Sequence, residues 1–346
     1  MRHRVILDVT GCSGRKTTGW ERYATHLSAA LESAVHSHPD LELLVAPGAP
    51  VAKSPLSYQA RALANFTVGS YNTTSHLQAA LYHTPTYPPG RVASSTKTIW
   101  TVHDDLILGG HSSYASRGTR AWAPIARRRL PHIDAIVTST RAVAHEIISA
   151  GAKPERVHVF TPATPALASE TSLPVLVDHM GQPTDIPAYF VLQVGTIEHR
   201  KRPDLSARAA RRLGVPLVLV GSPRGINVVD LGPGVLHSVQ TTDTQLSWLY
   251  QNAAALIAPS DYEGVDLPVF EAMSFGLGVC ASAIAVHEEL VTSAAHLFRP
   301  GSLISATTAL EETLATPKPS PSHPLSSWAK LATDHLDLYS ALCGRS

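Results

Sequence analysis

Short apolar runs alternate along the chain with longer segments in which apolar residues return every three or four positions. The short runs have the length of buried strands, and the periodic segments have one apolar face, as amphipathic helices do. The expected strands are Val5–Val9, Leu41–Ala46, Thr98–His103, Ile133–Thr138, Val157–Phe160, Tyr189–Val194, Val215–Val220, Ala253–Ala258 and Val279–Ala281. The expected helices are Trp20–Leu31, Arg141–Ala150, a helix ending at Leu213, Asp243–Ala254, a helix beginning at Leu267, Gly301–Leu314 and Ser326–Leu342.

This alternation predicts an α/β fold with parallel sheets and crossover helices. Periodicity is lost between Thr161 and Pro187, where Pro, Ser, Thr and Ala residues dominate. We therefore expect a first α/β domain over residues 1–165, a linker over 166–187, a second α/β domain over 188–325 and a C-terminal helix over 326–346. Two such halves joined by a linker imply a cleft between them.

The composition is typical of a globular protein in a reducing compartment. The chain has 346 residues, enough for two domains, and its net charge of +1 gives no general attraction for nucleic acid or an anionic membrane. Its three cysteines are far apart and odd in number, which favours neither a disulfide framework nor a zinc site. The N-terminal apolar stretch is too short for a signal sequence, and no apolar run is long enough to span a bilayer. We expect a cytoplasmic protein.

The stretch Ala258–Ser282 combines a strand end, a polar turn and the start of a helix. Leu267-Pro268 begins this helix, because proline is favoured at the first helical position. Glu263 lies in the turn, and Glu271 is expected within about the first turn of the helix. The N–H groups at a helix start bind anions, and a nearby carboxylate accepts hydroxyl protons. The pattern alone also fits a solvated loop acid and a helix acid favoured by the dipole.

Three further segments carry candidate chemistry. His103 and Asp104 follow a strand at its carboxyl end, where open α/β sheets bind ligands, although a lone histidine is as often structural. The glycines of the loop Thr10–Gly19 do not have the dinucleotide-binding spacing, so a tight turn and a substrate-facing loop both stay open. The Arg127–Arg129 run fits a solvated helix face, with an anionic acceptor or a lipid surface as the alternative.

Several motifs together resemble the retaining nucleotide-sugar glycosyltransferases of GT-B fold, the large group that includes sucrose synthases and bacterial mannosyltransferases. EGVDLPVFEAM, in which seven residues separate Glu263 from Glu271, is similar to the family's Glu-Gly-Phe-Gly-Leu-Pro-x-x-Glu-Ala-Met. VGTIEHRKRPDL, from Val194, resembles the family's strand-end segment ending in Arg-Lys, and TVHDDL resembles its Val-His-Asp. TGWERYATHL resembles the Gly-x-x-Arg-Tyr loop and helix on the acceptor side. The order of these motifs along the whole chain carries the resemblance.

The resemblance implies two Rossmann-like domains facing each other across a cleft. The first domain, 1–165, would bind the acceptor, and the second domain, 188–325, would bind the donor. The C-terminal helix would pack back on the first domain. The implied reaction moves a hexose or pentose from a UDP- or GDP-linked donor to an acceptor hydroxyl with retention of anomeric configuration. It implies no cofactor and no metal, because Arg, Lys and a helix end neutralise the diphosphate.

The family's functional residues carry over position by position. His103 is expected near the donor sugar, Glu263 near the transferred sugar, and Arg200 and Lys201 as catalytic cations on the diphosphate. Glu271 is expected to accept hydrogen bonds from the ribose hydroxyls. The expected donor-binding residues are Gly195, Thr196, Arg200, Lys201, Gly221, Ser222, Glu263, Gly264, Val265, Asp266, Leu267 and Glu271. The expected acceptor-side residues are Gly19, Trp20, Tyr23 and Asp104.

Three positions depart from the family pattern. Asp266 stands where relatives have glycine, Thr196 where some branches have arginine, and Thr161-Pro162-Ala163 where relatives often have Pro-Asn-Gly. The added side chain of Asp266 falls where backbone N–H groups approach the donor, so donor choice and efficiency stay open.

Two other functions also stay open at this point. One is a GT-B relative that hydrolyses or epimerises nucleotide sugars, and the other is a non-catalytic nucleotide-binding module. The acceptor is equally undecided among a glycan, a lipid, a small metabolite and, less favoured at a net charge of +1, a nucleic acid. Peripheral contact with a membrane is compatible with a lipid acceptor.

Overall fold

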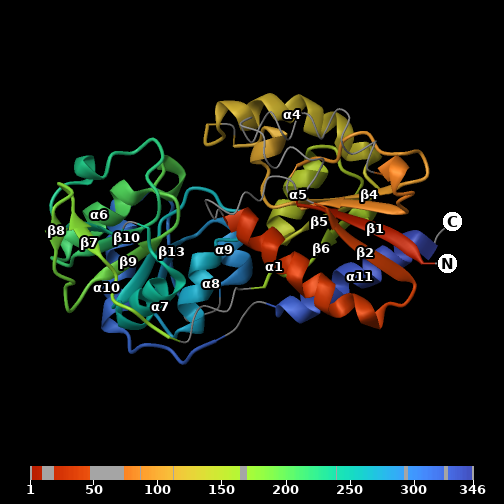
Figure 1. Cartoon of the computed structure of the whole chain (residues 1–346). Helices are drawn as coiled ribbons and strands as arrows, with labels where there is room; N and C mark the ends of the chain where they lie inside the picture. The colour runs from red at the N-terminus through yellow and green to blue at the C-terminus, as the bar shows by residue number, and fades with distance from the viewer. Residues whose placement is uncertain are drawn as a thin grey trace. The chain divides into compact units, whose positions relative to one another are not determined.

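The computed structural model describes residues 2–9, 19–46, 74–85, 87–111, 113–163, 170–238, 240–291, 295–322 and 326–344. The chain forms two compact units, which we call unit 1 (Met1–Ala163 with Ser326–Ser346) and unit 2 (Thr164–Leu325) (Figure 1). The part of the Thr10–Gly19 loop that precedes position 19 lies outside the described residues. Its two interpretations therefore stay open.

Unit 1 is built on a six-stranded sheet in which all neighbouring strands are parallel, in the order β2-β1-β3-β4-β5-β6. Its strands are β1 (His3–Asp8), β2 (Leu41–Ala46), β3 (Leu81–Thr84), β4 (Lys97–Val102), β5 (Ala135–Thr138) and β6 (Val157–Val159). Its described α-helices are α1 (Gly19–Ala34), α4 (Arg117–Arg129), α5 (Arg141–Ser149) and α11 (Trp328–Gly344). Its described 3-10 turns are η1 (Val35–Ser37), η4 (Leu106–Leu108), η5 (Leu130–His132) and η6 (Pro154–Arg156).

Both faces of the unit 1 sheet are buried, which is why its strands read as continuous apolar runs. One face, with Val5 and Leu7 of β1, packs in a core with apolar residues of α1 and α11. The other face, with Trp100 of β4 and Ile136 of β5, packs against α4 and α5. The C-terminal helix therefore packs on the N-terminal half of the chain, as the resemblance implies.

Two buried histidines join α11 to this sheet. His83 of β3 contacts the Tyr339 hydroxyl of α11 at 2.6 Å and the Thr101 hydroxyl of β4 at 2.8 Å. The ring of His335 stacks on that of His83 with centroids 5.5 Å apart and donates to the Leu331 carbonyl at 2.7 Å. Burial lowers the pKa of both histidines, and it lowers that of His335 to about 4 against the opposing effect of the Leu331 carbonyl. Both rings are therefore neutral at neutral pH.

Unit 2 contains an eight-stranded sheet in the order β14-β13-β12-β9-β10-β11-β7-β8, with β7 and β8 as an antiparallel edge. Its strands are β7 (Leu176–Asp178), β8 (Pro183–Thr184), β9 (Val191–Val194), β10 (Leu217–Val220), β11 (Val235–Ser238), β12 (Ala255–Ala258), β13 (Val279–Ser282) and β14 (Ala295–Phe298). Its described helices are η7 (His199–Lys201), α6 (Pro203–Arg212), η8 (Val228–Leu231), α7 (Asp243–Asn252), α8 (Leu267–Ser274), α9 (Ala285–Leu290) and α10 (Leu303–Ala315).

Helices cover both faces of the unit 2 sheet as well. Leu192 of β9 and Leu256 of β12 share a core with α7 and α8, whereas their neighbours Val191 and Ile257 share one with α6 and α10. This two-sided burial places the loops after β9, β10 and β12 at the carboxyl ends of adjacent parallel strands. Within the described residues, every helix is too short or too polar to cross a bilayer.

The edge strands of unit 2 correct two parts of the sequence prediction. The expected linker, 166–187, is wrong where β7 and β8 lie, because Leu176 is only 2% exposed and β7 pairs with β11. The strands β11 and β14 were not expected at all. Their sequences, VLHS and AHLF, each contain a histidine, so neither has the continuous apolar run of β10 (LVLV) or β12 (ALIA).

The buried histidines of unit 1 predict an acid-sensitive fold. Since the folded-state pKa of His335 is about 4, below its ordinary 6.5, the unfolded chain binds more protons between these values and stability falls as the pH falls through them. We expect His335→Gln to reduce the loss of unfolding free energy between about pH 7.5 and about pH 5 by roughly 2 kcal/mol. Denaturant titrations at both pH values measure this difference.

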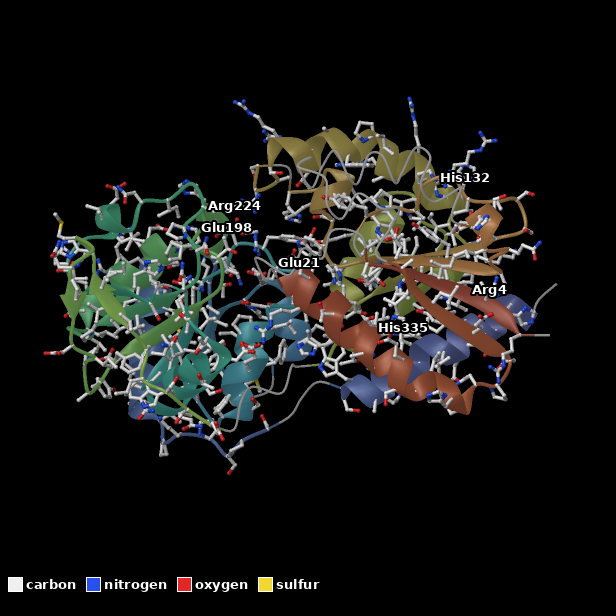
Figure 2. The ribbon with its side chains drawn as sticks, in the orientation of Figure 1. Arg4, Glu21, His132, Glu198, Arg224 and His335 are labelled. Carbon is white, nitrogen blue, oxygen red and sulfur yellow. The ribbon has the colours of Figure 1, made fainter. Side chains whose placement is uncertain are left out.

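The matched control is His132→Gln, since His132 is exposed in the same unit (Figure 2). It should keep the pH dependence of the parent protein. An unchanged pH dependence in His335→Gln would contradict the assignment of His335 as an acid-sensitive group.

Candidate functional site

The loop between β12 and α8 places both glutamates of the EGVDLPVFEAM motif. Asp266 precedes α8 with a left-handed backbone, φ +56°, and Pro268 follows in the first turn of the helix. A left-handed φ is costly for most residues but tolerated by glycine, asparagine and aspartate, which explains how aspartate replaces the family's glycine. Glu263 lies in the loop, 7% exposed. Glu271 is the fifth residue of α8 and so lies just past its first turn, close to the expected position.

A second loop, between β9 and α6, supplies the cations. Arg200 and Lys201 belong to the 3-10 turn η7 that follows β9. Gly195, at the end of β9, has φ +124°, and its backbone carbonyl lies 2.1 Å from where a Cβ on Gly221 would be. Only glycine fits at position 221, and the resulting close approach holds the loops after β9 and β10 together.

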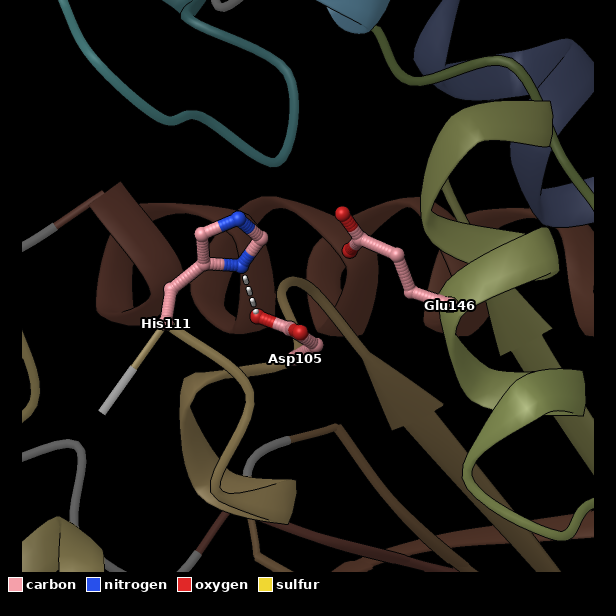
Figure 3. A group of neighbouring side chains, drawn as sticks. All are labelled: Asp105, His111 and Glu146. Carbon is pink, nitrogen blue, oxygen red and sulfur yellow. Dashed lines mark hydrogen bonds and ion pairs between the residues drawn. The ribbon is translucent and has the colours of Figure 1, made fainter.

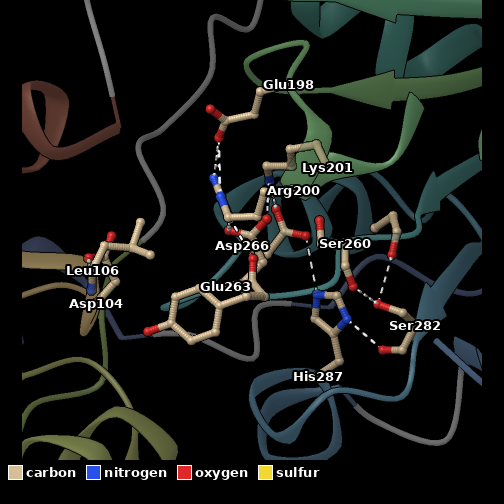
Figure 4. A network of polar contacts seen from close by, with 12 residues as sticks. Asp104, Leu106, Glu198, Arg200, Lys201, Ser260, Glu263, Asp266, Ser282 and His287 are labelled. Carbon is tan, nitrogen blue, oxygen red and sulfur yellow. Dashed lines mark hydrogen bonds and ion pairs between the residues drawn. The ribbon is translucent and has the colours of Figure 1, made fainter. Parts of the chain in front are cut away.

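The cations and acids of the two loops meet in one group of side chains, which we call the ion cluster (Figure 4). Its members are Glu198, Arg200, Lys201, Glu263, Asp266 and His287. Arg200 contacts Glu198 at 2.9 Å and Glu263 at 2.6 Å. The sequence expectation that Arg200, Lys201 and Glu263 lie together is thus matched by the geometry, and Glu263 is not the solvated loop acid of the alternative interpretation.

Lys201 occupies the middle of the ion cluster. Its Nζ lies 2.7 Å from both Glu263 Oε1 and Asp266 Oδ1, and the residue is 7% exposed. Burial alone would lower the pKa of Lys201, but the charges of Asp266 and Glu263 outweigh burial and raise it. Lys201 therefore remains an ammonium ion. Its printed hydrogen bond goes to Asp266 Oδ1, whereas its contact with Glu263 Oε1 is an ion pair, so the ammonium group retains donor capacity for a further anion.

His287, the first residue that the sequence interpretation missed, completes the cluster from α9. Its Nδ1 lies 2.7 Å from the Ser282 carbonyl and its Nε2 lies 3.2 Å from Asp266 Oδ2. Both neighbours accept hydrogen bonds, so both ring nitrogens carry protons and the ring is an imidazolium. Burial would lower the pKa of His287, but the hydrogen bond to Asp266 raises it. No motif pointed to His287, because only the fold brings α9 to the start of α8.

Asp266 is accordingly held by two cations rather than facing solvent. It is 4% exposed, and although burial raises the pKa of its carboxyl, Lys201 and His287 lower it well below the ordinary value. The aspartate side chain turns inward, against Lys201 and His287. The expectation that it lies where backbone N–H groups approach the donor stays a prediction.

Glu271 is positioned by a second residue that the sequence interpretation missed. The Tyr250 hydroxyl of α7 donates to Glu271 Oε2 at 2.8 Å, and both residues are buried. A surface acid favoured only by the helix dipole needs no such partner. The geometry therefore supports a fixed carboxylate, whose orientation Tyr250 sets.

The other expected donor-side residues surround these two loops. Gly195 and Gly221 form the close contact described above, and the Ser222 carbonyl accepts a hydrogen bond from Ile197 N at 3.0 Å. Thr196 is half-buried next to Gly195. Gly264, Val265 and Leu267 flank Glu263 and Asp266 in the loop before α8.

The expected acceptor-side residues lie in unit 1 at the end of β4 and the start of α1. His103 packs edge-on against Tyr23, with ring centroids 4.7 Å apart, and its Nε2 donates to the Pro85 carbonyl at 2.9 Å. Burial lowers the pKa of His103 to about 4, so the ring is neutral and its Nδ1 is an acceptor. Asp104 Oδ1 accepts from Leu106 N at 3.1 Å and so fixes the turn η4.

Gly19 and Trp20 open α1, on the same helix as Tyr23. Gly19 is exposed and Trp20 is half-buried.

The basic run of α4 is partly structural. Arg127 donates to the Leu108 carbonyl at 2.5 Å, and Arg129 donates to the Gly90 carbonyl at 2.5 Å. Arg127 and Arg128 are exposed and Arg129 is half-buried. The exposure of two of the three arginines fits the solvated-face interpretation, and the hydrogen bonds of Arg127 and Arg129 to backbone carbonyls give these two a structural role.

The chain is similar to known glycosyltransferases in part of its sequence. Residues 182–322 match the family model described as glycosyl transferases group 1. Among curated proteins, the D-inositol 3-phosphate glycosyltransferase of Mycobacteroides abscessus is 30% identical over 174 residues, a match that covers 44% of this chain and 37% of that relative. The matched segment thus spans little more than a third of that relative's length.

Solved structures are similar over the whole chain. The sucrose-phosphate synthase of Thermosynechococcus elongatus has a TM-score of 0.75 at 18% identity, covering 100% of both chains. HepE of Anabaena, in complex with UDP and glucose, has a TM-score of 0.63 at 16% identity and covers 99% of this chain and 100% of its own. At these identities the likeness concerns the fold.

The Asp266–His287 pair predicts a strong energetic coupling. Asp266→Asn keeps the shape and suits the left-handed backbone, but it leaves the buried His287 imidazolium without its counter-ion, so we expect a loss of about 3 kcal/mol in unfolding free energy. His287→Gln should cost at least about 1 kcal/mol less in the Asp266→Asn background than alone. Urea titrations of the double-mutant cycle measure the coupling, and additive effects would contradict it.

The sign of the pH dependence gives an independent check. Because the folded-state pKa of His287 is raised above 6.5, its stabilising effect is complete below that value and is lost as the pH rises through the raised pKa. Asp266→Asn should remove this alkaline loss. The exposed Asp230 of the same unit provides the control, and Asp230→Asn should retain it.

Proposed function

Since the chain belongs to glycosyl transferases group 1 by its domain at residues 182–322 and has the GT-B fold class, we propose that it transfers a sugar from a nucleoside-diphosphate donor to an acceptor hydroxyl. The observation that carries this proposal is the ion cluster. It joins Arg200 and Lys201 of the VGTIEHRKRPDL segment to Glu263 of the EGVDLPVFEAM motif, inside the matched domain.

The diphosphate is the leaving group, so the donor site must stabilise negative charge that grows as the sugar–oxygen bond breaks. Lys201 supplies a buried ammonium group that retains donor capacity beyond its contacts with Glu263 and Asp266. Arg200 lies beside it, and the first turn of α8 adds N–H groups. These groups are held before the donor arrives, which is the condition under which they lower the barrier rather than merely bind.

The two motif glutamates are proposed to bind the two sugar parts of the donor, the ribose and the transferred sugar. Glu271, oriented by Tyr250, is proposed to accept hydrogen bonds from the ribose hydroxyls. Glu263, held between Arg200 and Lys201, is proposed to orient hydroxyls of the transferred sugar or to stabilise positive charge at its anomeric carbon. Gly195, Thr196, Gly221, Ser222, Gly264, Val265 and Leu267 complete the proposed donor site.

Retention of configuration and independence from a metal at the donor site are parts of the same proposal. Same-face attack, with the leaving phosphate helping to take the acceptor proton, needs no protein nucleophile. The cations of the ion cluster can neutralise the diphosphate in place of a divalent ion. UDP is the first nucleotide to test, since HepE binds UDP and glucose, and GDP is the alternative.

The acceptor is proposed to bind unit 1 around His103, Tyr23, Asp104, Gly19 and Trp20. The neutral ring of His103 presents Nδ1 as a hydrogen-bond acceptor for a hydroxyl. Inositol phosphate heads the acceptor panel because of the curated relative's name, followed by glycans, lipid-linked acceptors and small metabolites. We also propose a cytoplasmic location, because the described cysteines, Cys280 and Cys343, are free thiols.

The decisive experiment measures donor binding and turnover with the parent protein and two variants. We expect Lys201→Ala and Glu271→Gln each to lower kcat/KM by about 100-fold or more, because each removes a preorganised charge or acceptor at the donor. Isothermal titration with UDP and GDP and a nucleotide-release assay over the donor and acceptor panels provide the readouts.

The controls are Lys318→Ala and Glu311→Gln, which change exposed residues of the same unit and should keep full activity. Full activity in Lys201→Ala would contradict the proposal. Release of free sugar without any acceptor would identify a hydrolase instead. Nucleotide binding without turnover across the panels would identify a binding module.

A further inference from the structure

A second polar group lies in unit 1, apart from the ion cluster of unit 2. Asp105, His111 and Glu146 each turn one ligand-type atom toward the others, and these atoms all lie within 4.8 Å of one another (Figure 3). Asp105 follows β4, His111 lies in the turn after η4, and Glu146 projects from α5. Asp105 and His111 flank η4 in one connection, and Glu146 comes from the separate helix α5, so the fold brings two segments of the chain together here.

The turn is shaped around the Asp105 carboxylate. His111 has a left-handed backbone, φ +43°, and its Nδ1 lies 3.0 Å from Asp105 Oδ1. A Cβ on Gly110 would lie 1.6 Å from Asp105 Oδ2, so only glycine allows the turn to close on the carboxylate. The Asp105 side chain is 10% exposed and that of His111 is 40% exposed. One ligand is therefore fixed by packing, and another is reachable from solvent.

The spacing of these atoms is close to that of ligands around one ion. Two ligands about 2.1 Å from a metal at angles of 90–110° are about 3.0–3.4 Å apart. The Asp105–His111 distance of 3.0 Å already falls in this range. The ligand-type atom of Glu146 lies within 4.8 Å of both other atoms, so a shift of at most about 1.8 Å would bring it into the same range.

Charge also favours a cation here. The ligand-type atoms of Asp105 and Glu146 lie within 4.8 Å of each other, so a divalent ion placed between them would interact with both carboxylates. Such an ion would use a ring nitrogen of His111 as its third protein ligand. The donor set of one imidazole nitrogen and two carboxylate oxygens suits first-row transition ions better than Mg²⁺ or Ca²⁺, which prefer oxygen alone.

We propose that Asp105, His111 and Glu146 bind a divalent transition-metal ion of the zinc and manganese class in unit 1. The ion ties the turn after β4 to α5 and keeps coordination positions open for water or a ligand oxygen. This site goes beyond the proposed transfer reaction and does not involve the donor-binding cations. The sequence interpretation missed it because Glu146 lies 35 residues after His111, and only the fold brings α5 to the turn that contains Asp105 and His111.

The test uses the full-length protein stripped of metal with a chelator. Titration with ZnCl₂, MnCl₂ and MgCl₂ should show one bound ion per chain, tightest for Zn²⁺ and weakest for Mg²⁺. Thermal unfolding should shift upward with Zn²⁺, as expected for a ligand that binds only the folded state. Addition of Co²⁺ should give visible absorption bands that report the ligands.

His111→Ala and Glu146→Gln should each weaken binding at least 10-fold and alter the Co²⁺ spectrum. Circular dichroism and the metal-free Tm show whether each variant is folded. If His111→Ala is unstable, Glu146→Gln still tests the site, because glutamine has nearly the same shape as glutamate. The matched controls are His132→Ala and Glu155→Gln, which change exposed residues of unit 1 and should bind like the parent. Lys201→Ala should also bind like the parent, which separates this proposal from the proposed transfer reaction.

Two results would overturn the proposal. Absence of any binding of Zn²⁺, Mn²⁺ or Co²⁺ by the parent would show that the group is held by hydrogen bonds alone. Unchanged affinity and unchanged Co²⁺ spectrum in both His111→Ala and Glu146→Gln would show that the ion binds to other histidines of the chain.

Discussion

One buried ammonium group, Lys201 Nζ, is the point on which the polar side of unit 2 depends. A lysine at 7% exposure keeps its charge only if anions surround it, and Glu263 and Asp266 each lie 2.7 Å away. Asp266 is in turn stable as a buried carboxylate because Lys201 and His287 both face it. Each charge of the group therefore makes the next one tolerable, and the loops after β9 and β12 and the helix α9 are held in place together.

The close approach of Gly195 and Gly221 makes this arrangement possible. The two glycines bring the ends of β9 and β10 together, so the turn η7 directs Lys201 toward the start of α8. On the other side, Tyr250 fixes Glu271 from α7. Polar chemistry in unit 2 thus rests on backbone geometry that only small residues allow, and on an apolar core that covers both faces of the sheet.

The sequence predicted the central strands and most described helices because two-sided burial leaves long apolar runs, as in Leu217–Val220 and Ala255–Ala258. It also placed Arg200, Lys201 and Glu263 in one site, through motifs whose order matched a family. It failed where the signal is not local. A histidine interrupts the short apolar runs of β11 and β14, and β7 and β8 have only three and two residues. His287 and Tyr250 reach the motif residues only through the fold. Asp266 turns inward because it pairs with His287, and no pattern in the sequence indicates this partner.

The balance of charge in the ion cluster has a consequence for how a nucleotide approaches it. Three cations, Arg200, Lys201 and His287, face three carboxylates, Glu198, Glu263 and Asp266, so the group as a whole carries little net charge. A neutral group projects a weak field beyond a Debye length, about 8 Å at physiological salt. A diphosphate is therefore attracted only at short range, by exchanging with carboxylates already in place. Its rate of association should depend far less on ionic strength than for a site lined by unpaired arginines and lysines.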